Sequence, residues 1–275
     1  MPDTSSQDLQ ISPLCDALGA QIEGVDLRKA LPKKTLIQVT EALHKHLLLL
    51  IRDQDLSPAH QIAFSAKFGP VQTHPPTDGR SLPGYPEILA IQSNPRKRVS
   101  LSDPHPAGQW LCDMSYSPQP QRYGVIHARA AVSGQSDFIF ANLQRPYQSL
   151  SSGLRRFLTP LQATHHQPKD KDGATGTARR AKHPLILAHP QMGAKGLYVN
   201  PAYTKNLEHL SQEESRPLLD GLFQKIVAPD NTYRHRWRPG DVLVWDCHFT
   251  AHYVVPITAE MGAEELRQTT VAHSP

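Results

Sequence analysis

A short segment near the middle of the chain decides how the rest is interpreted: Trp110-Leu111-Cys112-Asp113-Met114-Ser115-Tyr116. It follows a long stretch rich in proline and glycine. It looks like a metal-binding motif whose first ligand is missing. A lone aspartate does not define a site, so the residues on both sides of this segment must show what it does.

The composition limits the class of protein. The 275 residues are 39% hydrophobic and 20% charged, which is typical of a soluble globular protein with a sizeable core. The longest apolar run, residues 47–51, is too short to span a bilayer, and the polar, acidic N-terminus does not resemble a secretory signal. Three cysteines, far apart, predict no disulfide framework. We therefore expect a cytoplasmic protein.

The net charge of +4 does not indicate a nucleic-acid partner. Basic residues are scattered, apart from two short runs at 95–98 and 179–182, and such runs are typical of solvated loops. We expect a small organic molecule as the partner, and neither nucleic acid nor membrane. Exposed helices could also pair two copies of the chain into a homo-oligomer.

The first third of the chain predicts strands and helices in alternation. Residues 9–28 favour two strands around a turn, and Pro32 opens a helix to about His46. The apolar run 47–51 is typical of a strand buried on both faces. Ser57 is a good N-cap for a second helix. Residues 71–108 are proline-rich with little periodicity, which predicts an irregular active-site loop.

The remaining two thirds are rich in predicted strands, at 124–131, 137–142, 185–188, 196–199 and 269–272. The segments 232–237 and 242–245 favour a hairpin-like pair around a Pro-Gly turn. Short helices are expected at 151–158 and after Ser211, which forms a capping box with Glu214. Residues 168–182 predict a disordered loop. Many short strands with a few helices indicate an antiparallel β sandwich or barrel.

A series of short segments, in the same order along the chain, resembles the TauD/TfdA family of Fe(II)- and 2-oxoglutarate-dependent dioxygenases. Together they span nearly the whole length of the chain. The matches are residues 19–27 (GAQIEGVDL), 52–58 (RDQDLSP), 64–70 (FSAKFGP), 110–116 (WLCDMSY), 140–142 (FAN), 197–201 (LYVNP), 233–241 (YRHRWRPGD), 245–246 (WD) and His252. The resemblance implies one domain over residues 1–275. Its fold would be α+β and mainly β, a distorted double-stranded β-helix (jelly roll) core with flanking helices.

The resemblance also implies an iron site, and this sequence departs from it. Family members hold Fe(II) with two histidines and one carboxylate, which leaves positions for 2-oxoglutarate and O2. In the family, the first histidine and the carboxylate lie close together in the motif Trp-His-x-Asp. Here Trp110 and Asp113 match, but Leu111 stands at the histidine position and has no lone pair. The distal ligand is present as His252, so two of three metal ligands remain.

The co-substrate site implied by the resemblance has changed as well. The family anchors 2-oxoglutarate with an arginine, a natural bidentate partner of a carboxylate. Registered on residues 269–272, that arginine falls at Glu264, and a second family arginine falls at Gln268. A one-residue shift would bring Arg267 to the second position. The assisting threonine falls at Phe138. Mismatches in independent parts of one site indicate lost function.

Several residues are candidates to replace the missing ligand: Cys112, Cys247, His248, His74 and His105. Adjacent strand residues face opposite ways, so Cys112 should point away from the direction of Leu111. We expect both cysteines to act as small buried hydrophobes. The predicted small-molecule pocket contains His74, Trp110, Cys112, Tyr116, Asn142, Trp245, Arg267 and Gln268.

Three functions remain open. The favoured one is a protein that has lost standard oxygenation but keeps a pocket, and catalyses a non-oxidative isomerisation, cyclisation, dehydration or cleavage without a cofactor. Asp113 or His252 would then act as acid or base. The second is a non-catalytic pseudoenzyme that binds a ligand or an active relative. The third is a working dioxygenase with Fe(II), 2-oxoglutarate and an unusual ligand set.

Overall fold

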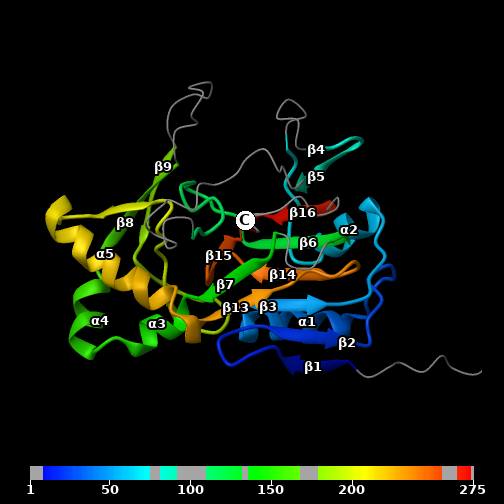
Figure 1. Cartoon of the computed structure of the whole chain (residues 1–275), viewed down its shortest axis with the longest axis horizontal. Coiled ribbons are helices and arrows are strands. Elements are labelled where there is room, and N and C mark those ends of the chain that lie inside the picture. Colours follow the sequence, from blue (N-terminus) through cyan, green and yellow to red (C-terminus); the bar gives the residue numbers. More distant parts are fainter. Residues whose placement is uncertain are drawn as a thin grey trace, which may run out of the picture.

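The largest element of the fold is an eight-stranded sheet in the order β1-β2-β3-β14-β6-β16-β5-β4 (Figure 1). The computed structural model describes residues 9–74, 81–91, 110–131, 136–167, 179–255 and 265–273. The strands of this large sheet are β1 Gln10–Pro13, β2 Ala20–Glu23, β3 Leu48–Ile51, β14 Val242–Asp246, β6 Tyr123–Ala130, β16 Glu265–Val271, β5 Tyr85–Ile91 and β4 Ser81–Leu82.

Smaller sheets complete the strand-rich core. The order β13-β7-β15 joins Thr232–His235, Phe138–Asn142 and Thr250–Val254, and we call it the small sheet. A second three-stranded sheet joins β12 Thr204–Leu207, β8 Gln162–His166 and β9 Arg180–Pro184, and a hairpin joins β10 Ile186–Ala188 to β11 Lys195–Leu197. The strand pairs among these residues are antiparallel except for β2 with β3. This arrangement confirms the predicted jelly-roll class.

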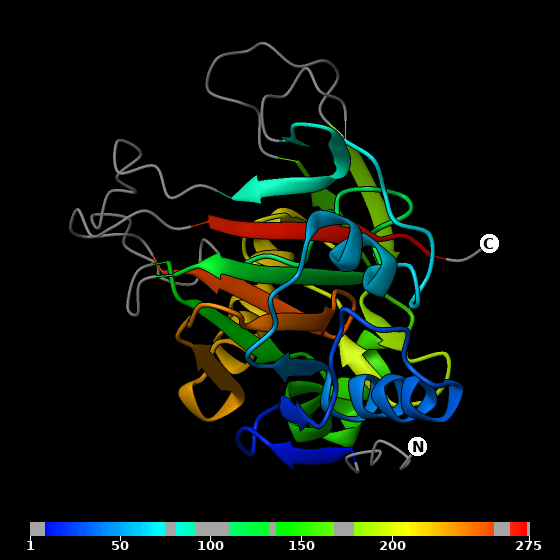
Figure 2. The same cartoon turned by 90° about the vertical axis from the view of Figure 1, so that its right-hand side faces the viewer.

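Side-chain alternation gives the large sheet two different faces. Leu50, Ile126 and Trp245 point to the barrel interior, where they meet Phe140 of the small sheet in one core cluster. Their sequence neighbours on the same strands point to the opposite face and form a second cluster with α1 Lys33–His46 and α2 Pro58–Ser65. Figure 2 shows both helices in front of the large sheet. The apolar strand β3 is buried on both faces, as predicted.

The other helices gather at the opposite end of the molecule, beyond the small sheet (Figure 1). They are α3 Gln144–Ser149, α4 Ser152–Leu158 and α5 Gln212–Ile226, followed by the short 3-10 turn Pro229–Asn231. The capping box of Ser211 and Glu214 opens α5 as predicted. None of the helices in the described ranges is long and apolar enough to cross a membrane.

The structure corrects two predicted segments. The segments 232–237 and 242–245 do not form a hairpin: β13 pairs with β7, whereas β14 pairs with β3 and β6. The chain changes sheets at Gly240, whose carbonyl accepts a hydrogen bond from the Gln54 backbone at 2.8 Å. Glycine suits this position because its φ is +84° and an added Cβ would lie 3.1 Å from Gln54 N.

The region predicted as an irregular loop, residues 71–108, contains a hairpin. Strands β4 and β5 turn at Gly84, with a φ of +80°, and β5 pairs with β16 at the edge of the large sheet. The prolines around it obscured the strand pattern in the sequence. Of the loop predicted at 168–182, residues 168–178 lie outside the described part, and its end belongs instead to β9.

Candidate functional site

Leu111 lies directly opposite His252 in the structure. The Leu111 N–H donates to the His252 carbonyl at 3.0 Å and the His252 N–H donates to the Leu111 carbonyl at 2.9 Å, which makes an isolated antiparallel bridge. Directly opposed residues of an antiparallel pair project to the same side. The position beside the His252 side chain therefore holds a leucine, as the sequence pattern predicted.

Asp113 lies next to the same histidine. Its Oδ2 atom accepts a hydrogen bond from Trp245 Nε1 at 3.0 Å and lies 3.6 Å from both Cys247 Sγ and His252 Nδ1. The Asp113 side chain is 14% exposed, whereas the His252 Nδ1 atom is buried and has no hydrogen-bond partner. The fold thus brings three predicted site residues, Asp113, Trp245 and His252, into one centre at the end of the barrel interior.

A glycine on the neighbouring strand makes this arrangement possible. Gly124 on β6 pairs with Trp245 on β14. A Cβ atom at position 124 would lie only 2.1 Å from the Trp245 indole, so the indole occupies the volume that any larger residue would need. Gly124 therefore lets the indole lie flat on β6, in the orientation that directs Nε1 toward Asp113.

The wall beside His252 is aromatic. The ring of Phe138 stacks on the His252 imidazole with centroids 5.8 Å apart and an interplanar angle of 7°. Phe140 lies at the same centroid distance on the next inward position of β7. Phe138 also meets Trp237 edge to face. A phenyl ring offers no hydroxyl to a co-substrate, and here it fills space next to the imidazole.

The opposite wall of the barrel interior carries uncharged polar groups. Gln268 and Thr270 on β16 pair with Ile126 and Gly124, so they share the face of the barrel interior. The Thr270 hydroxyl lies 3.2 Å from the side-chain oxygen of Gln72 and 3.5 Å from His74 Nε2. The predicted pocket residues His74 and Gln268 therefore belong to this wall.

Arg267 does not reach the interior. It pairs with His127, whose side chain faces α2, and its guanidinium donates to Glu265 on its own strand. The one-residue shift that would place Arg267 in the pocket is therefore wrong, because strand alternation turns this side chain to the opposite face of the sheet, where it is buried. Glu264, the residue at the expected anchor position, lies outside the described residues.

Three more residues predicted for the pocket serve the core instead. Trp110 stacks on Tyr253, and Cys112 is fully buried beside it in the cluster behind the small sheet. Burial raises the pKa of the Cys112 thiol, which keeps it protonated. Asn142 donates to the Ala17 carbonyl and accepts from the first backbone N–H of α3, so it is a structural cap. Their pattern in the sequence could not show which face they occupy.

The remaining predicted residues do not share one location. Tyr116 meets Tyr203 edge to face at 5.0 Å. Cys247 is buried, and burial also raises the pKa of its thiol well above the usual range. His248 projects to the other side of its strand, away from Asp113, and His105 lies outside the described residues. Both Cys112 and Cys247 are thus buried in the structure, as expected for small hydrophobic side chains.

Iron bound in this fold would need a third ligand beside Asp113 and His252. The unpartnered His252 Nδ1 and the adjacent carboxylate match two ligands of the family set. The third position is occupied by Leu111, and no group of three His, Cys, Asp or Glu side chains suited to a metal occurs within the described ranges. The described residues do not complete the three-ligand site.

The chain matches proteins of known function over nearly its whole length. The family model described as "Taurine catabolism dioxygenase TauD, TfdA family" covers residues 10–270. An alkylsulfatase of Acinetobacter baylyi is 27% identical over 91% of this chain and 81% of its own length. A pentalenolactone F synthase of Streptomyces arenae is 28% identical over 89% of each. A crystal structure of a taurine dioxygenase from Burkholderia xenovorans superposes with a TM-score of 0.86 and 28% identity, covering 97% of this chain and 90% of that one.

Proposed function

The chain belongs to the TauD/TfdA family of dioxygenases, and from this premise we propose that its barrel binds a small organic molecule on which Asp113 and His252 act without a three-ligand iron centre. The reaction would be a non-oxidative isomerisation, cyclisation, dehydration or cleavage. The observation that carries the proposal is the bridge between Leu111 and His252. It supports the proposal because Leu111, opposite His252, has no lone pair to offer at the position where the resemblance implies a ligand.

A second departure supports the same conclusion from another strand. Phe138 lies on β7, separate in sequence from both Leu111 and His252, and its ring covers one face of the imidazole. The resemblance to the family implies a threonine hydroxyl at this position. Two changes on different strands meet at one histidine, and both remove groups that iron and 2-oxoglutarate would use.

The centre retains groups suited to proton transfer. Trp245 and Cys247 both contact Oδ2 of Asp113, so the carboxylate is held in one orientation. His252 adds an imidazole nitrogen that has no partner in the protein. A carboxylate and an imidazole aimed at the same space are the usual general acid and general base of such reactions.

The polar wall indicates the kind of substrate. Gln268, Thr270 and His74 present amide, hydroxyl and imidazole groups, and Arg267 points elsewhere. Amide and hydroxyl groups hydrogen-bond carbonyl or hydroxyl oxygens without a full opposite charge. We infer a substrate whose distal group is polar and uncharged.

A second candidate function is the Fe(II)- and 2-oxoglutarate-dependent oxygenation that the names of several relatives describe. These relatives support it more strongly than they support a non-oxidative reaction. In the structure it is favoured by the buried His252 Nδ1, which faces Asp113 with no other partner. The iron would then have two protein ligands, and the chain's own residues would supply only Asp113 and His252.

A restored ligand separates the two functions. The Leu111→His variant places an imidazole opposite His252, and the Asp113→Ala variant removes a required ligand as the matched control. Each protein is titrated anaerobically with Fe(II) and 2-oxoglutarate, and the visible charge-transfer band and succinate release are measured. We expect no band in the native protein and tighter Fe(II) binding in Leu111→His.

The outcomes are distinct. A charge-transfer band together with succinate from the native protein would overturn the first proposal and establish the second. Without them, a rise in melting temperature on adding a small uncharged ligand in the presence of a chelator would support the first. That rise should be lost in a Gln268→Ala variant, since the ligand would contact the polar wall.

A further inference from the structure

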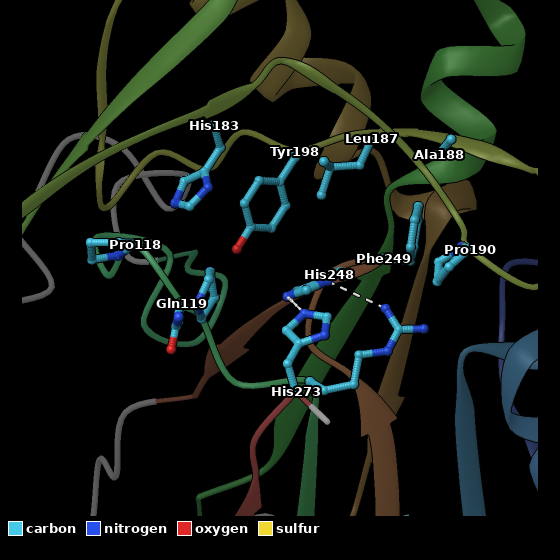
Figure 3. Close-up of a pocket in the computed structure, with 12 residues that line it drawn as sticks. Pro118, Gln119, His183, Leu187, Ala188, Pro190, Tyr198, His248, Phe249 and His273 are labelled. Carbon is cyan, nitrogen blue, oxygen red and sulfur yellow. Dashed lines mark hydrogen bonds between the residues drawn. The ribbon is translucent and has the colours of Figure 1, made fainter. Parts of the chain in front are cut away.

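A second hollow lies on the other side of the strand from Asp113. It is a cavity of about 540 Å³ between the β14–β15 turn, the β10–β11 hairpin and the end of β16 (Figure 3). Its apolar walls include Leu187, Pro190 and Phe249, and its polar groups are Arg122, His183, Tyr198, His248 and His273. None of these polar residues belongs to the centre described above.

The end of β14 separates this cavity from the centre at Asp113 and His252. Trp245 and Cys247 contact Asp113, whereas Asp246 and His248 contact Arg122 at the wall of the cavity. This division follows from the alternation of side chains along an extended segment. The cavity is therefore close to the barrel centre but is lined by different residues.

The floor of the cavity is a buried ion pair. Arg122 Nη2 lies 3.1 Å from Asp246 Oδ2, and the two side chains are 6% and 0% exposed. Burial alone would raise the pKa of Asp246, but the hydrogen bond with His189 and the charge of Arg122 outweigh burial, and the pKa lies below its usual range. The pair is charged on both sides and neutral overall.

The contacts of His248 and His273 indicate which ring nitrogen of each carries the proton. A guanidinium only donates hydrogen bonds, so the contact of 3.3 Å from Arg122 Nη1 makes His248 Nδ1 an acceptor. The His248 proton is then on Nε2, which faces His273 Nε2 at 3.3 Å. Burial lowers the pKa of His248 to about 3, in agreement with a neutral ring. His273 accepts at Nε2 and keeps its own proton on Nδ1 as a donor.

Tyr198 adds a second donor. The residue is 1% exposed, and its hydroxyl has no hydrogen-bond partner among the described residues. Figure 3 shows the hydroxyl directed into the cavity between Gln119 and His248. Burial raises the pKa of Tyr198 well above its usual range, so the O–H remains a donor. A buried hydroxyl without a partner is unfavourable, and a ligand oxygen that accepts from it would remove that cost.

We propose that this cavity binds a small cyclic monocarboxylic acid, with its carboxylate accepting hydrogen bonds from Tyr198 and His273 and its ring against Leu187 and Phe249. The unpartnered Tyr198 hydroxyl and the His273 N–H are two donors for one carboxylate, whose single negative charge needs less compensation than that of a dianion. Asp246 already balances much of the Arg122 charge, so a dianion such as phosphate would lack a sufficient counter-charge. The apolar side of the cavity fits a hydrocarbon ring.

Calorimetry with benzoate tests the proposal, with benzyl alcohol as the uncharged analogue. We expect the native protein to bind benzoate and to bind benzyl alcohol at least tenfold more weakly, because hydrogen bonds to a charged acceptor are the stronger ones. Tyr198→Phe should weaken benzoate binding about tenfold while the unliganded melting temperature stays equal or rises, since only an unpartnered hydroxyl is lost. Leu187→Trp should abolish binding by filling the cavity.

Matched controls locate the binding site. Tyr203→Phe removes a hydroxyl outside this cavity, and Gln268→Ala alters the barrel wall, so both should bind benzoate as the native protein does. Absence of benzoate binding, equal affinity in Tyr198→Phe, or loss of binding in Gln268→Ala would overturn the proposal. These results do not depend on iron or on activity, so the proposed function can fail separately.

Discussion

Residues 245–248, at the end of β14, separate two sites whose carboxylates have different partners. On the barrel side, the partly exposed Asp113 accepts from an indole N–H and lies 3.6 Å from both the Cys247 thiol and His252 Nδ1. On the cavity side, Asp246 is fully buried and paired with Arg122. The barrel side holds its carboxylate with an indole N–H and a thiol beside His252, whereas the cavity side holds its carboxylate with a guanidinium. Neighbouring residues of one strand can therefore serve sites with opposite electrostatics.

We expect the largest loss of stability when the buried ion pair on the cavity side is broken. Arg122→Met leaves the Asp246 carboxylate buried without its counter-charge, and we expect a loss of about 4 kcal/mol in the free energy of unfolding. Urea denaturation measures this change. The matched control is Arg216→Met on α5, which removes an exposed pair with Asp220 and should cost about 0.5 kcal/mol. Equal losses in the two variants would show that the buried pair has no special importance.

The next largest loss of stability is expected when the packing of the Trp245 indole on the barrel side is disturbed. Gly124→Ala forces a methyl group into the Trp245 indole and should cost about 3 kcal/mol as the indole leaves Asp113. Thermal unfolding and tryptophan fluorescence would report both changes. Gly221→Ala is the control, because nothing lies within 4 Å of an added Cβ there and alanine favours a helix by about 1 kcal/mol. A stable Gly124→Ala protein with unchanged fluorescence would contradict the packing argument.

The stability of the cavity side is expected to depend on pH through His248. The pKa of His248 is lowered from 6.5 to about 3, mainly by burial, with Arg122, His273 and His183 lowering it and Asp246 raising it. The unfolded chain therefore binds a proton below pH 6.5 that the folded protein does not bind. Stability is fully present above pH 6.5 and is lost as the pH falls toward 3.

At pH 5 this linkage amounts to about 2 kcal/mol relative to pH 7. His248→Gln has no such group, so the free energy of unfolding of this variant should fall less over the same interval, by about that amount. Denaturant titrations at both pH values give the difference. Parallel pH profiles for the native protein and the variant would show that His248 is protonated in the folded state.

The smallest effect is expected on the barrel side. Asp113→Asn keeps an oxygen that can accept from Trp245, and no lysine or arginine among the described residues pairs with this carboxylate. The hydrogen bond changes from charged to neutral, so we expect a loss of only about 1 kcal/mol in the free energy of unfolding. Denaturation of this variant beside Arg122→Met tests the comparison directly. A loss as large as that of Arg122→Met would mean that Asp113 has a strong charged partner.

Much of the fold could be predicted from local sequence signals. The capping box at Ser211, the cap at Ser57 and the apolar strand β3 all form as their residue patterns predict. The predictions failed where pairing is decided at long range. Strand β13 pairs with a strand far earlier in the chain instead of with β14, and β5 forms at a sheet edge within a proline-rich region. Local propensity carries no information about a distant partner.

The candidate site divides in the same way. The sequence by itself determined that leucine stands at the ligand position and that an aspartate and a distal histidine remain, because identity and order suffice for that. Only the tertiary structure decided that Leu111 faces His252, that Phe138 stacks on its ring and that Arg267 points to the opposite face of the sheet.

The cavity around Arg122, Tyr198 and His273 depends wholly on the tertiary structure. Its residues come from separate strands and turns, and no sequence pattern indicates that they share a cavity. The physical reason is strand alternation: a shift of one residue exchanges the two faces of a sheet, and only the paired register shows which face each side chain takes.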